Sequence, residues 1–491
     1  MKKYLSLLLA IAISAVLSGG VVNAAAATKS AAVLPTKTEQ VINKTPATYK
    51  SFGIKKTEKN AFKSKVSQNV KLPIINITTN NEDIVSRDKY VSCVVDVFNC
   101  EKSQIIDEAS AGVKVRGNSS AYDGDVEKIL SNPVPYRIKF DSKTNMLGLN
   151  NGAKCKSWVL LKSDWDLIRN DIALRFGRAI IGDNAFCSDA QFVHLYVNDK
   201  FQGIYVLCEQ SQVNPKRVNI TEPKKGYTGT DIGYYLELDN YAYGEEGNYF
   251  FTVDYGGYKV KDIRGTSRKF VPAEYSIKSD VYSQEQIDFI DKYLNNLFEI
   301  VYRACEKKEY LTFDENYDLV KSKYKNAKDT ISAVMDVQSV VDMYLLYEIV
   351  HDYDCGEGSF YMCIDFAKDS KCPKLQFTSP WDFNWAYNDS TSRYWAAAFS
   401  EQSFVDEYGD RSNPWFIVLM KQKWFSDMAK QKWSGLSKAG VIKGCIDEEI
   451  KILETYKKDL NKTDSWATDC SYQLLDWINK RIKWMDKTFA V

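Results

Sequence analysis

The stretch FVHLYVNDKFQGIYVL at residues 192–207 decides how the first part of the chain folds. Two runs in which apolar and polar residues alternate flank Asn198-Asp199-Lys200, and Asn and Asp are favoured in tight turns. The pattern predicts a β-hairpin with strands at 192–197 and 203–207. Further strand-like segments come earlier, at 113–115, 135–140 and 157–161.

One helix interrupts this region, because apolar residues recur at helical spacing after Ser163-Asp164 and Gly182 is suited to end the helix. After residue 280 helical periodicity dominates, at 284–305, 337–350 and 442–487, the last with a break around 463–467. Strands first and helices later predict an α+β fold of two lobes, one sheet-rich and one mainly helical, with a cleft between them.

The first residues, MKKYLSLLLAIAISAVLSGGVVNAAAA, combine two lysines, an apolar run and small residues, the pattern of a secretory signal peptide at 1–24. An uncleaved membrane anchor is the alternative, but interrupting Ser and Gly residues favour cleavage. Cleavage predicts a secreted or cell-surface protein without a membrane span. Residues 25–70 have the composition of a disordered linker or pro-segment. The folded domain is therefore expected at 71–491, with lobes at about 71–230 and 231–491.

Composition excludes several classes of protein. The chain has 65 Lys and Arg against 64 Asp and Glu, and this balance argues against nucleic-acid binding. Its two histidines, His194 and His351, weaken mechanisms that need a His triad or imidazole metal ligands. The motifs G-x-x-x-x-G-K-[ST], H-E-x-x-H and G-x-S-x-G are absent. The 11 cysteines leave disulfides, such as Cys93 with Cys100, and buried free thiols both open.

An acidic constellation follows the helix expected at 337–350. His351-Asp352-Tyr353-Asp354 precedes a glycine-bearing turn and a strand-like segment from Ser359, and SPWDFNW at 379–385 places Asp382 after a second short apolar run. One Asp can accept the proton of a hydroxyl while another holds Mg²⁺ that bridges nucleotide phosphates. The pattern points to phosphoryl transfer, and solvated turn carboxylates are the alternative.

Longer strings, in chain order, resemble one family. The segments that carry the resemblance are VKVRGNSS at 113–120, PYRIKF at 135–140, WVLLKSDWDLIRND at 158–171, LYVNDKFQGIYVLCEQ at 195–210, GYYLELD at 233–239, the HDYD segment and PWDFNWAYND at 380–389. Together they are similar to the CotH family, the atypical kinases of spore coat protein H type. The resemblance spans about residues 75–430. It implies a protein-kinase-like two-lobed fold that uses ATP with Mg²⁺ (or Mn²⁺) to phosphorylate Ser or Thr of secreted or coat proteins.

The resemblance also implies site residues. Asp354 resembles the catalytic Asp of the family and Asp382 its metal-binding Asp, with Ser359 and Asn384 as further metal ligands. The chain departs from the family here, because Asn often stands at the place of Ser359 and a second Asp at that of Asn384. Lysines that the family commonly places before PYRIKF are missing, since 132–135 reads Asn-Pro-Val-Pro.

Phosphate neutralisation is therefore assigned to Arg116, Lys139 and Arg169, and Glu209 falls where a kinase hinge would run. Structural interpretations stay open for all four: a turn arginine for Arg116, an outward strand residue for Lys139, an ion pair on its own helix for Arg169 and a solvated strand end for Glu209.

The leading hypothesis is a protein serine/threonine kinase whose partners are ATP and a Ser/Thr-rich protein acceptor. A second hypothesis is a pseudokinase that acts as a surface or carbohydrate-associated interaction module. A third is a glycosidase with a carboxylate pair such as Glu237 and Asp354, which predicts sugar release without ATP.

Overall fold

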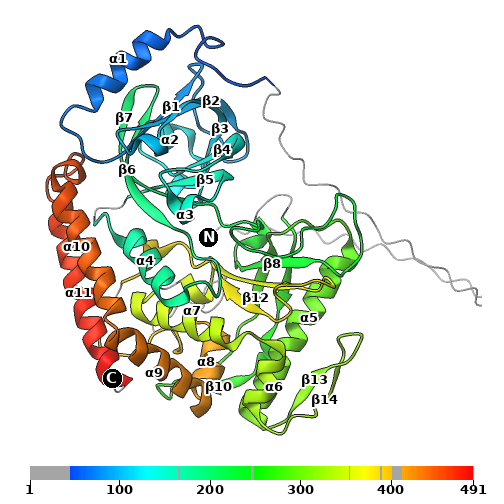
Figure 1. Ribbon diagram of the computed structural model, residues 1–491. Coiled ribbons are helices and arrows are strands. Elements are labelled where there is room, and N and C mark those ends of the chain that lie inside the picture. Colours follow the sequence, from blue (N-terminus) through cyan, green and yellow to red (C-terminus); the bar gives the residue numbers. More distant parts are fainter. Residues whose placement is uncertain are drawn as a thin grey trace, which may run out of the picture.

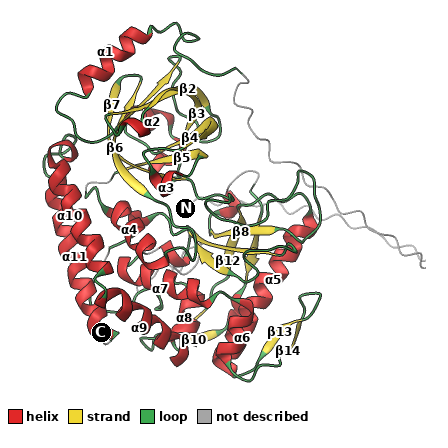
Figure 2. Cartoon of the chain, in the orientation of Figure 1, coloured by secondary structure: helices red, strands yellow, loops and turns green. Residues whose placement is uncertain are grey.

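The computed structural model describes residues 45–163, 166–244, 248–352, 354–387, 390–400 and 412–489. A β-barrel forms one end of the molecule, and a larger part made of sheets and helices lies beside it (Figures 1 and 2). The predicted signal peptide at 1–24 lies outside the described residues and stays a prediction. Among the residues described, no helix combines the length and the apolar character needed to cross a bilayer.

Seven strands close the barrel in the order β1-β2-β3-β4-β5-β7-β6. All neighbours are antiparallel except β1 and β6, whose parallel pairing closes the ring. Alternate residues of each strand point inward, and side chains such as Val113, Ile138 and Trp158 fill the interior. The strands are β1 (Ile74–Thr79), β2 (Val91–Phe98), β3 (Ile106–Val115), β4 (Tyr136–Thr144), β5 (Cys155–Lys162), β6 (Ala190–Val197) and β7 (Lys200–Glu209).

The predicted hairpin is confirmed as β6 and β7. Asn198 and Asp199 both have left-handed backbone angles, φ 49° and 63°, which two-residue hairpin turns of this hand require. The predicted helix is confirmed as α4 (Arg169–Ile181), which ends at Gly182 with φ 58°. This helix leaves the barrel and packs against two helices of the other part, α7 (Val337–Val350) and α10 (Val441–Leu460).

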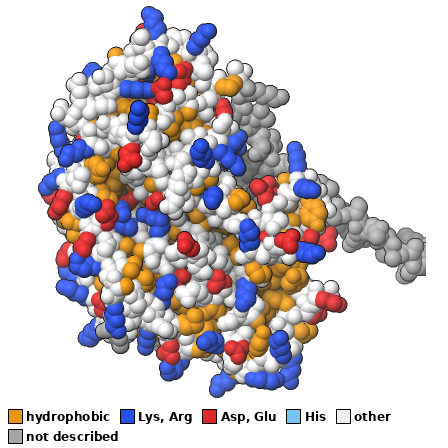
Figure 3. All heavy atoms as spheres, in the orientation of Figure 1, with side chains coloured by type: hydrophobic (Ala, Val, Ile, Leu, Met, Phe, Trp, Pro, Cys, Tyr) orange, Lys and Arg blue, Asp and Glu red, His pale blue; other side chains and the backbone are white. Residues whose placement is uncertain are grey.

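The linker expected at 25–70 is wrong for its described residues, 45–70. They contain α1 (Lys56–Val66), and Tyr49 is buried and donates a hydrogen bond to Asp96 of β2. Ion pairs add to the apolar contact that the Phe62 ring makes with the Tyr196 ring: the Lys59 ammonium lies 2.7 Å from Asp199, and the Lys63 ammonium lies 2.7 Å from Asp96 and from Asp107. Figure 3 shows basic and acidic side chains close together at this end of the molecule. A lysine-rich helix held in this way resembles a polar linker in sequence.

The second part is built on a five-stranded antiparallel sheet in the order β16-β15-β8-β12-β9. Its strands are β8 (Gly233–Leu238), β9 (Phe250–Val253), β12 (Ala273–Ile277), β15 (Phe360–Asp365) and β16 (Gln376–Thr378). Two small hairpins add β10 (Lys259–Lys261) with β11 (Ser267–Lys269) and β13 (Leu311–Phe313) with β14 (Leu319–Lys321). The sequence predicted the helices that make up most of the second part, but it did not predict this five-stranded sheet. Every residue of β8 is buried, so the strand lacks the alternation by which strands are recognised.

The helices of this part include those predicted from periodicity. They are α5 (Gln284–Tyr302), α6 (Ala327–Val334), α7, α8 (Pro414–Met420), α9 (Lys423–Lys438), α10 and α11 (Ala467–Thr488), while α2 (Val126–Ser131) and α3 (Leu149–Gly152) belong to the barrel. The break expected around 463–467 lies between α10 and α11. One buried apolar cluster includes outward residues of β5 and β7, such as Val159 and Cys208, together with Ile172 of α4 and Val350 of α7. This cluster joins the barrel to the second part.

Candidate active site

The first acidic segment begins where α7 ends. His351 caps this helix with a left-handed backbone, φ 53°, and its ring stacks on Trp395 at 4.6 Å between centroids. The chain then turns at Asp354, whose carbonyl oxygen accepts hydrogen bonds from the amides of Glu357 (2.9 Å) and Gly358 (2.8 Å). The Asp354 turn, residues 354–358, leads through Ser359 into β15.

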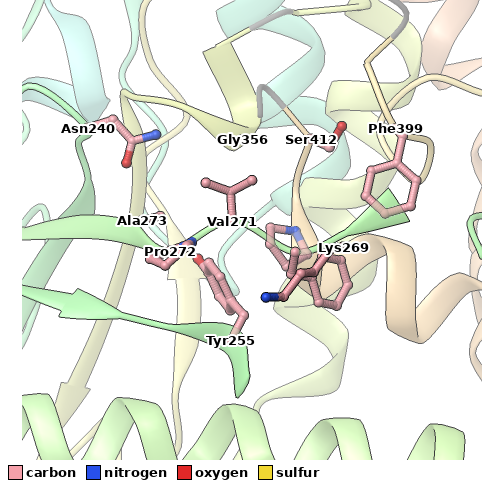
Figure 4. A pocket seen from close by; sticks show the side chains of 11 residues that line it. Asn240, Tyr255, Lys269, Val271, Pro272, Ala273, Gly356, Phe399 and Ser412 are labelled. Carbon is pink, nitrogen blue, oxygen red and sulfur yellow. The ribbon is translucent and has the colours of Figure 1, made fainter. Parts of the chain in front are cut away.

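Neighbouring segments hold the Asp354 turn from the other side. The Asn413 side chain donates to the Cys355 carbonyl (2.8 Å), the Asn240 amide donates to the Glu357 carbonyl (2.9 Å), and Gly356 packs on the backbone of Ser412. A pocket between these segments has room for little more than a water molecule; Figure 4 shows Asn240, Gly356 and Ser412 around it. The turn is therefore fixed by contacts with two separate stretches of chain, one at Asn240 and one at 412–413.

Asp382 lies in the loop that follows β16 and adopts φ 61°. Asn170, in the first turn of α4, accepts a hydrogen bond from the Phe383 amide (3.1 Å) and donates one to the Asn384 side-chain oxygen (2.8 Å). The residues on either side of Phe383, 382 and 384, are thereby tied to α4. This role of Asn170 was not predicted, although Arg169 and Asn170 both lie in the segment WVLLKSDWDLIRND at 158–171 that resembles the family.

Backbone strain concentrates around these two segments. His351, Ser359, Ser379, Asp382 and Tyr387 are all left-handed, with φ from 52° to 61°, and none of them is glycine. Such conformations cost of order 1–3 kcal/mol each and persist where the surroundings enforce them, most often at functional sites. The strain supports this region as the candidate active site.

Electrostatics show that the two acidic segments meet. Burial raises the pKa of Asp352 well above its usual range, and the carboxylates of Asp354 and Asp382 raise it further, while Arg169 opposes them. Burial also raises the pKa of Asp382, against the opposing effects of Arg116 and a hydrogen bond from the Asn384 amide. The charges of Asp354 and Asp382 thus both act on the buried Asp352, to which the sequence analysis gave no role. The catalytic role of Asp354 and the metal-binding role of Asp382 stay predictions.

Arg116 reaches this site from the barrel. Its guanidinium carbon lies 5.1 Å from the centre of the Trp381 ring, next to Asp382. Gly117, the residue after it, has φ 89°, and a side chain there would meet the Ser120 hydroxyl at 2.2 Å. The turn therefore needs glycine, and it places Arg116 against the Asp382 loop of the second part.

Arg169 forms an ion pair, which was the structural alternative to a phosphate-binding role in the sequence analysis. Its guanidinium lies 2.7 Å from the Asp166 carboxylate, and it also donates to the Ala386 carbonyl and lies over the Tyr387 ring. Arg169 therefore fastens the residues after Asp382 to α4, and its contact with ATP stays a prediction.

Lys139 belongs to a basic row on the outer face of the barrel. Strand register pairs Lys114 with Arg137 and Gly112 with Lys139, so these three basic side chains point to the same side as Arg116. We call Lys114, Arg116, Arg137 and Lys139 the basic row. Across β5 and β7 the same face is apolar and carries the buried Val159 and Cys208 that join the two parts. Lys114 and Arg137 were not singled out in the sequence.

Glu209 and Glu237 are already engaged within the protein. Glu209 is buried, lies 3.1 Å from the Arg217 guanidinium and accepts a hydrogen bond from the Asn150 amide (2.9 Å). Its role in nucleotide binding stays a prediction. Glu237 lies 2.6 Å from the Lys278 ammonium and accepts from the Tyr361 hydroxyl at 2.6 Å. Nothing in this arrangement favours the glycosidase hypothesis.

The oxygen donors at the site suit a hard cation. Among the described residues no group of three or more His, Cys, Asp or Glu is placed to hold a metal ion on its own. Mg²⁺ characteristically takes one or two carboxylates and completes its shell with phosphates and water. Asp382 and Asp354 beside the buried Asp352 provide such carboxylates, and the Asp352 Oδ1 atom has no hydrogen-bond partner among the described residues. The side-chain oxygen of the exposed Asn384 is shared with Asn170.

The fold and the site together define a protein in which a buried aspartate cluster of the second part lies near an arginine of the barrel. The family model described as CotH kinase protein matches residues 113–485, and the chain belongs to the CotH kinase family. The resemblance seen in the sequence is thereby confirmed. No curated protein matches the chain.

Proposed function

We propose that this chain is a secreted atypical protein kinase that transfers the γ-phosphate of ATP to Ser or Thr residues of extracellular, coat or surface proteins. The observation that carries the proposal is that the charges of Asp354 and Asp382 both act on the buried Asp352, while Arg116 of the barrel lies against Trp381 and acts on Asp382. Phosphoryl transfer is catalysed mainly by positioning and charge stabilisation, and these residues supply both acids and a cation. Membership of the CotH kinase family supports the same activity.

A two-lobed, kinase-like reading of the fold belongs to this proposal. The barrel corresponds to the first lobe, and the five-stranded sheet with α4 to α11 corresponds to the second. ATP would lie where the basic row faces the Asp354 turn and the Asp382 loop. Arg116 is the member of the row with a contact to the Asp382 loop.

Each site residue then has one task. Asp354 accepts the proton of the acceptor hydroxyl, and Arg116 and Lys139 bind phosphate oxygens from the barrel side. Asp382, with Ser359 or Asn384, would hold Mg²⁺ or Mn²⁺, which neutralises phosphate charge when bound. Asn170 and Arg169 keep the Asp382 loop in place through their bonds to Phe383, Asn384 and Ala386.

A second candidate function is a pseudokinase that binds a surface partner without transfer. Two observations favour it. Ser359 offers one hydroxyl where the family often has an amide, and the side-chain oxygen of Asn384 already accepts a hydrogen bond from Asn170. Both features reduce the ligands available to a metal ion.

Transfer of label from γ-labelled ATP to casein or a Ser-rich peptide, with Mg²⁺ or Mn²⁺, tests the proposal. Wild type is expected to label the acceptor, while Asp354→Ala and Asp382→Ala lower the rate at least 100-fold, as is typical of groups that act in proton transfer and charge stabilisation. Asp369→Ala is the matched control, because Asp369 is an exposed Asp in the loop between β15 and β16. Wild type that labels no acceptor with either metal would support the pseudokinase, and label that survives both active-site substitutions would refute the site.

Secretion needs its own measurement. The signal-peptide prediction expects a secreted chain that begins after residue 24, and the mass of the protein recovered from the medium reports this directly. A chain that keeps residues 1–24 and stays with the membrane fraction would contradict it.

A further inference from the structure

Two cysteines meet in the hairpin that joins the two acidic segments. The sulfur atoms of Cys363, in β15, and Cys372, in the loop between β15 and β16, lie 3.6 Å apart. The Cys372 sulfur also lies 3.7 Å from the Cys363 carbonyl oxygen, so the Cys372 side chain packs against the β15 backbone. No other two cysteine thiols within the described residues share a hydrogen bond.

The surroundings of the pair suit a disulfide. Both side chains are buried, and they belong to a small apolar cluster with Tyr235, Val218 and Ile220. A disulfide carries no N–H or O–H group that would need a partner in such a cluster. Its sulfur atoms are bonded at about 2.05 Å, so the two thiols have to approach by about 1.5 Å, which small rotations of two side chains can supply.

The pair stands at the end of the hairpin that lies away from the acidic segments. Strand β15 begins just after the Asp354 turn, and β16 ends just before the chain enters the Asp382 loop. Three residue pairs hold the two strands together, and Cys363 with Gln376 is the last of them. A covalent link at this end would keep the register of a short ladder, and this register sets where both acidic segments begin.

Strand geometry excludes the other pair that the sequence suggested. Cys93 and Phe98 both belong to β2, so their Cα atoms lie about 17 Å apart at 3.3–3.4 Å per residue. The two further residues to Cys100 span at most about 7.6 Å. The Cα atoms of Cys93 and Cys100 are therefore at least about 9 Å apart, whereas a disulfide spans at most about 7 Å. Cys93, buried inside the barrel, becomes a matched control.

We propose that Cys363 and Cys372 form a disulfide as the exported chain folds, and that this link holds the β15–β16 hairpin. The inference takes its oxidising environment from the proposed secretion and uses no other part of the proposed function. The hydrogen bond with Cys372, and then burial, raise the pKa of the Cys363 thiol well above its ordinary value. Because thiolates are the reactive form, the bond is expected to form during folding, before the pair is buried.

The oxidant is a disulfide, either of a small molecule such as glutathione or of a thiol–disulfide oxidoreductase. One cysteine thiolate attacks it, forming a mixed disulfide and releasing one thiolate. The second cysteine thiolate attacks the mixed disulfide and releases the other. The released thiolates take up the two protons that the cysteines lose, so the chain is oxidised by two electrons and the oxidant is reduced to two thiols.

Peptide mapping tests the link. The full chain is synthesised in a cell-free system that contains oxidised glutathione, and remaining thiols are alkylated in denaturant before digestion with trypsin. Lys368 and Lys371 lie between the two cysteines, so the peptides that carry them stay joined only by a disulfide. We expect this joined product, with Cys93 alkylated. Alkylation of both Cys363 and Cys372, or a link from either to a different cysteine, would overturn the inference.

Thermal unfolding tests the effect of the link on the hairpin. Reduction with dithiothreitol is expected to lower the melting temperature of the linked wild type by about 3–6 °C, as for a closed loop of about ten residues in a chain of this size. Cys93→Ala is expected to keep this drop, and the double variant Cys363→Ala/Cys372→Ala to lose it. Equal melting temperatures for linked and reduced wild type would overturn the role of the link in holding the hairpin.

The peptide map does not depend on label transfer, so the two proposals can fail separately. A joined product from a chain that transfers no label supports this inference and contradicts the kinase proposal. Alkylated Cys363 and Cys372 in a chain that transfers label contradict this inference alone. A joined product from a chain that, in cells, keeps residues 1–24 and stays with the membrane fraction supports the pairing and contradicts the proposed secretion.

Discussion

Gly356 gives the sharpest test of the Asp354 turn. A Cβ atom on Gly356 would lie 2.3 Å from the Ser412 carbonyl carbon and 2.5 Å from its oxygen, both backbone atoms that cannot rotate away. Non-bonded carbon atoms rest about 3.5–4.0 Å apart, so Gly356→Ala has to separate the two segments by roughly 1 Å. Overpacking of this kind typically costs about 1–3 kcal/mol of folding free energy.

The effect on transfer is expected to exceed the effect on stability. Asp354 is two residues away in the same turn, and a displacement of about 1 Å at a reacting group can lower a rate about 100-fold. Gly358→Ala is a matched control, because a Cβ at Gly358 meets no atom within 4 Å. The measurement is the rate of label transfer per folded molecule, with the folded fraction taken from circular dichroism.

Two results would refute this reasoning. Equal rates for Gly356→Ala and Gly358→Ala would mean that the position of the Asp354 turn does not matter for transfer. A rate that falls only in proportion to the folded fraction would mean that the glycine serves stability alone.

Two further substitutions test the support of the Asp382 loop and a buried carboxylate of α7. Asn170→Ala removes the acceptor of the Phe383 amide and the donor to Asn384, which is expected to cost about 2–4 kcal/mol in urea unfolding and to lower kcat more than KM for ATP. Asn145→Ala is the control, because it loses three side-chain hydrogen bonds within the barrel and is expected to cost stability alone. Burial raises the pKa of Asp342 to about 6, and Lys432 opposes this effect. The folded state therefore binds the proton more tightly than the unfolded state does. As a result, the stability that this group contributes rises as pH falls from about 6 to 4. Asp342→Asn is therefore expected to raise the free energy of unfolding at pH 8 by at most about 3 kcal/mol and by nothing at pH 4; equal effects at both pH values would contradict the assignment.

Local signals in the sequence were sufficient for some elements. The hairpin at 190–209 was predicted because Asn198 and Asp199 tolerate the left-handed turn that joins its strands. The α7 helix was predicted with its observed bounds, 337–350, although it is buried on nearly every side. In both cases the residues that decide the structure are neighbours in the chain.

Other elements depend on distant contacts and were missed. Each residue of β8 is buried between partners that come from 273–277 and 360–365, so its own pattern resembles any apolar segment. The α1 helix depends on Asp199, which lies 140 residues away from Lys59. Such partners become visible only when the fold brings them together.

The residues of the candidate site also fall into two groups, those that local sequence indicates and those that depend on distant contacts. Asp354 and Asp382 were indicated by the strand-like segments beside them and by the family resemblance, and Arg116 by its place between a strand and Gly117; their roles in phosphoryl transfer stay predictions. Asn170 acts on residues more than 200 positions later, and only the structure shows that the Nε atom of Arg137 is buried without a described hydrogen-bond partner. The sequence therefore indicated the charged groups, while the groups that position them or leave room for a ligand required the structure.

The C-terminal helices take part in this positioning. Arg481 of α11 is fully buried and donates to the Glu348 carbonyl (2.9 Å), and it also donates to the carbonyls of Thr391 (3.0 Å) and Arg393 (2.8 Å). Glu348 in turn accepts the amides of Trp395 and Ala396, and the Trp395 ring stacks on His351 at the start of the acidic segment.

This chain of contacts explains how left-handed residues persist around the aspartates. His351 is held between Trp395 and Trp477 of α11, while Tyr387 is held by the Val350 carbonyl and by Arg169. These two strained residues are thus fixed by helices from other regions of the sequence. Because a strained loop relaxes when its supports are removed, the geometry at Asp354 and Asp382 depends on α4 and α11 as much as on the loops themselves.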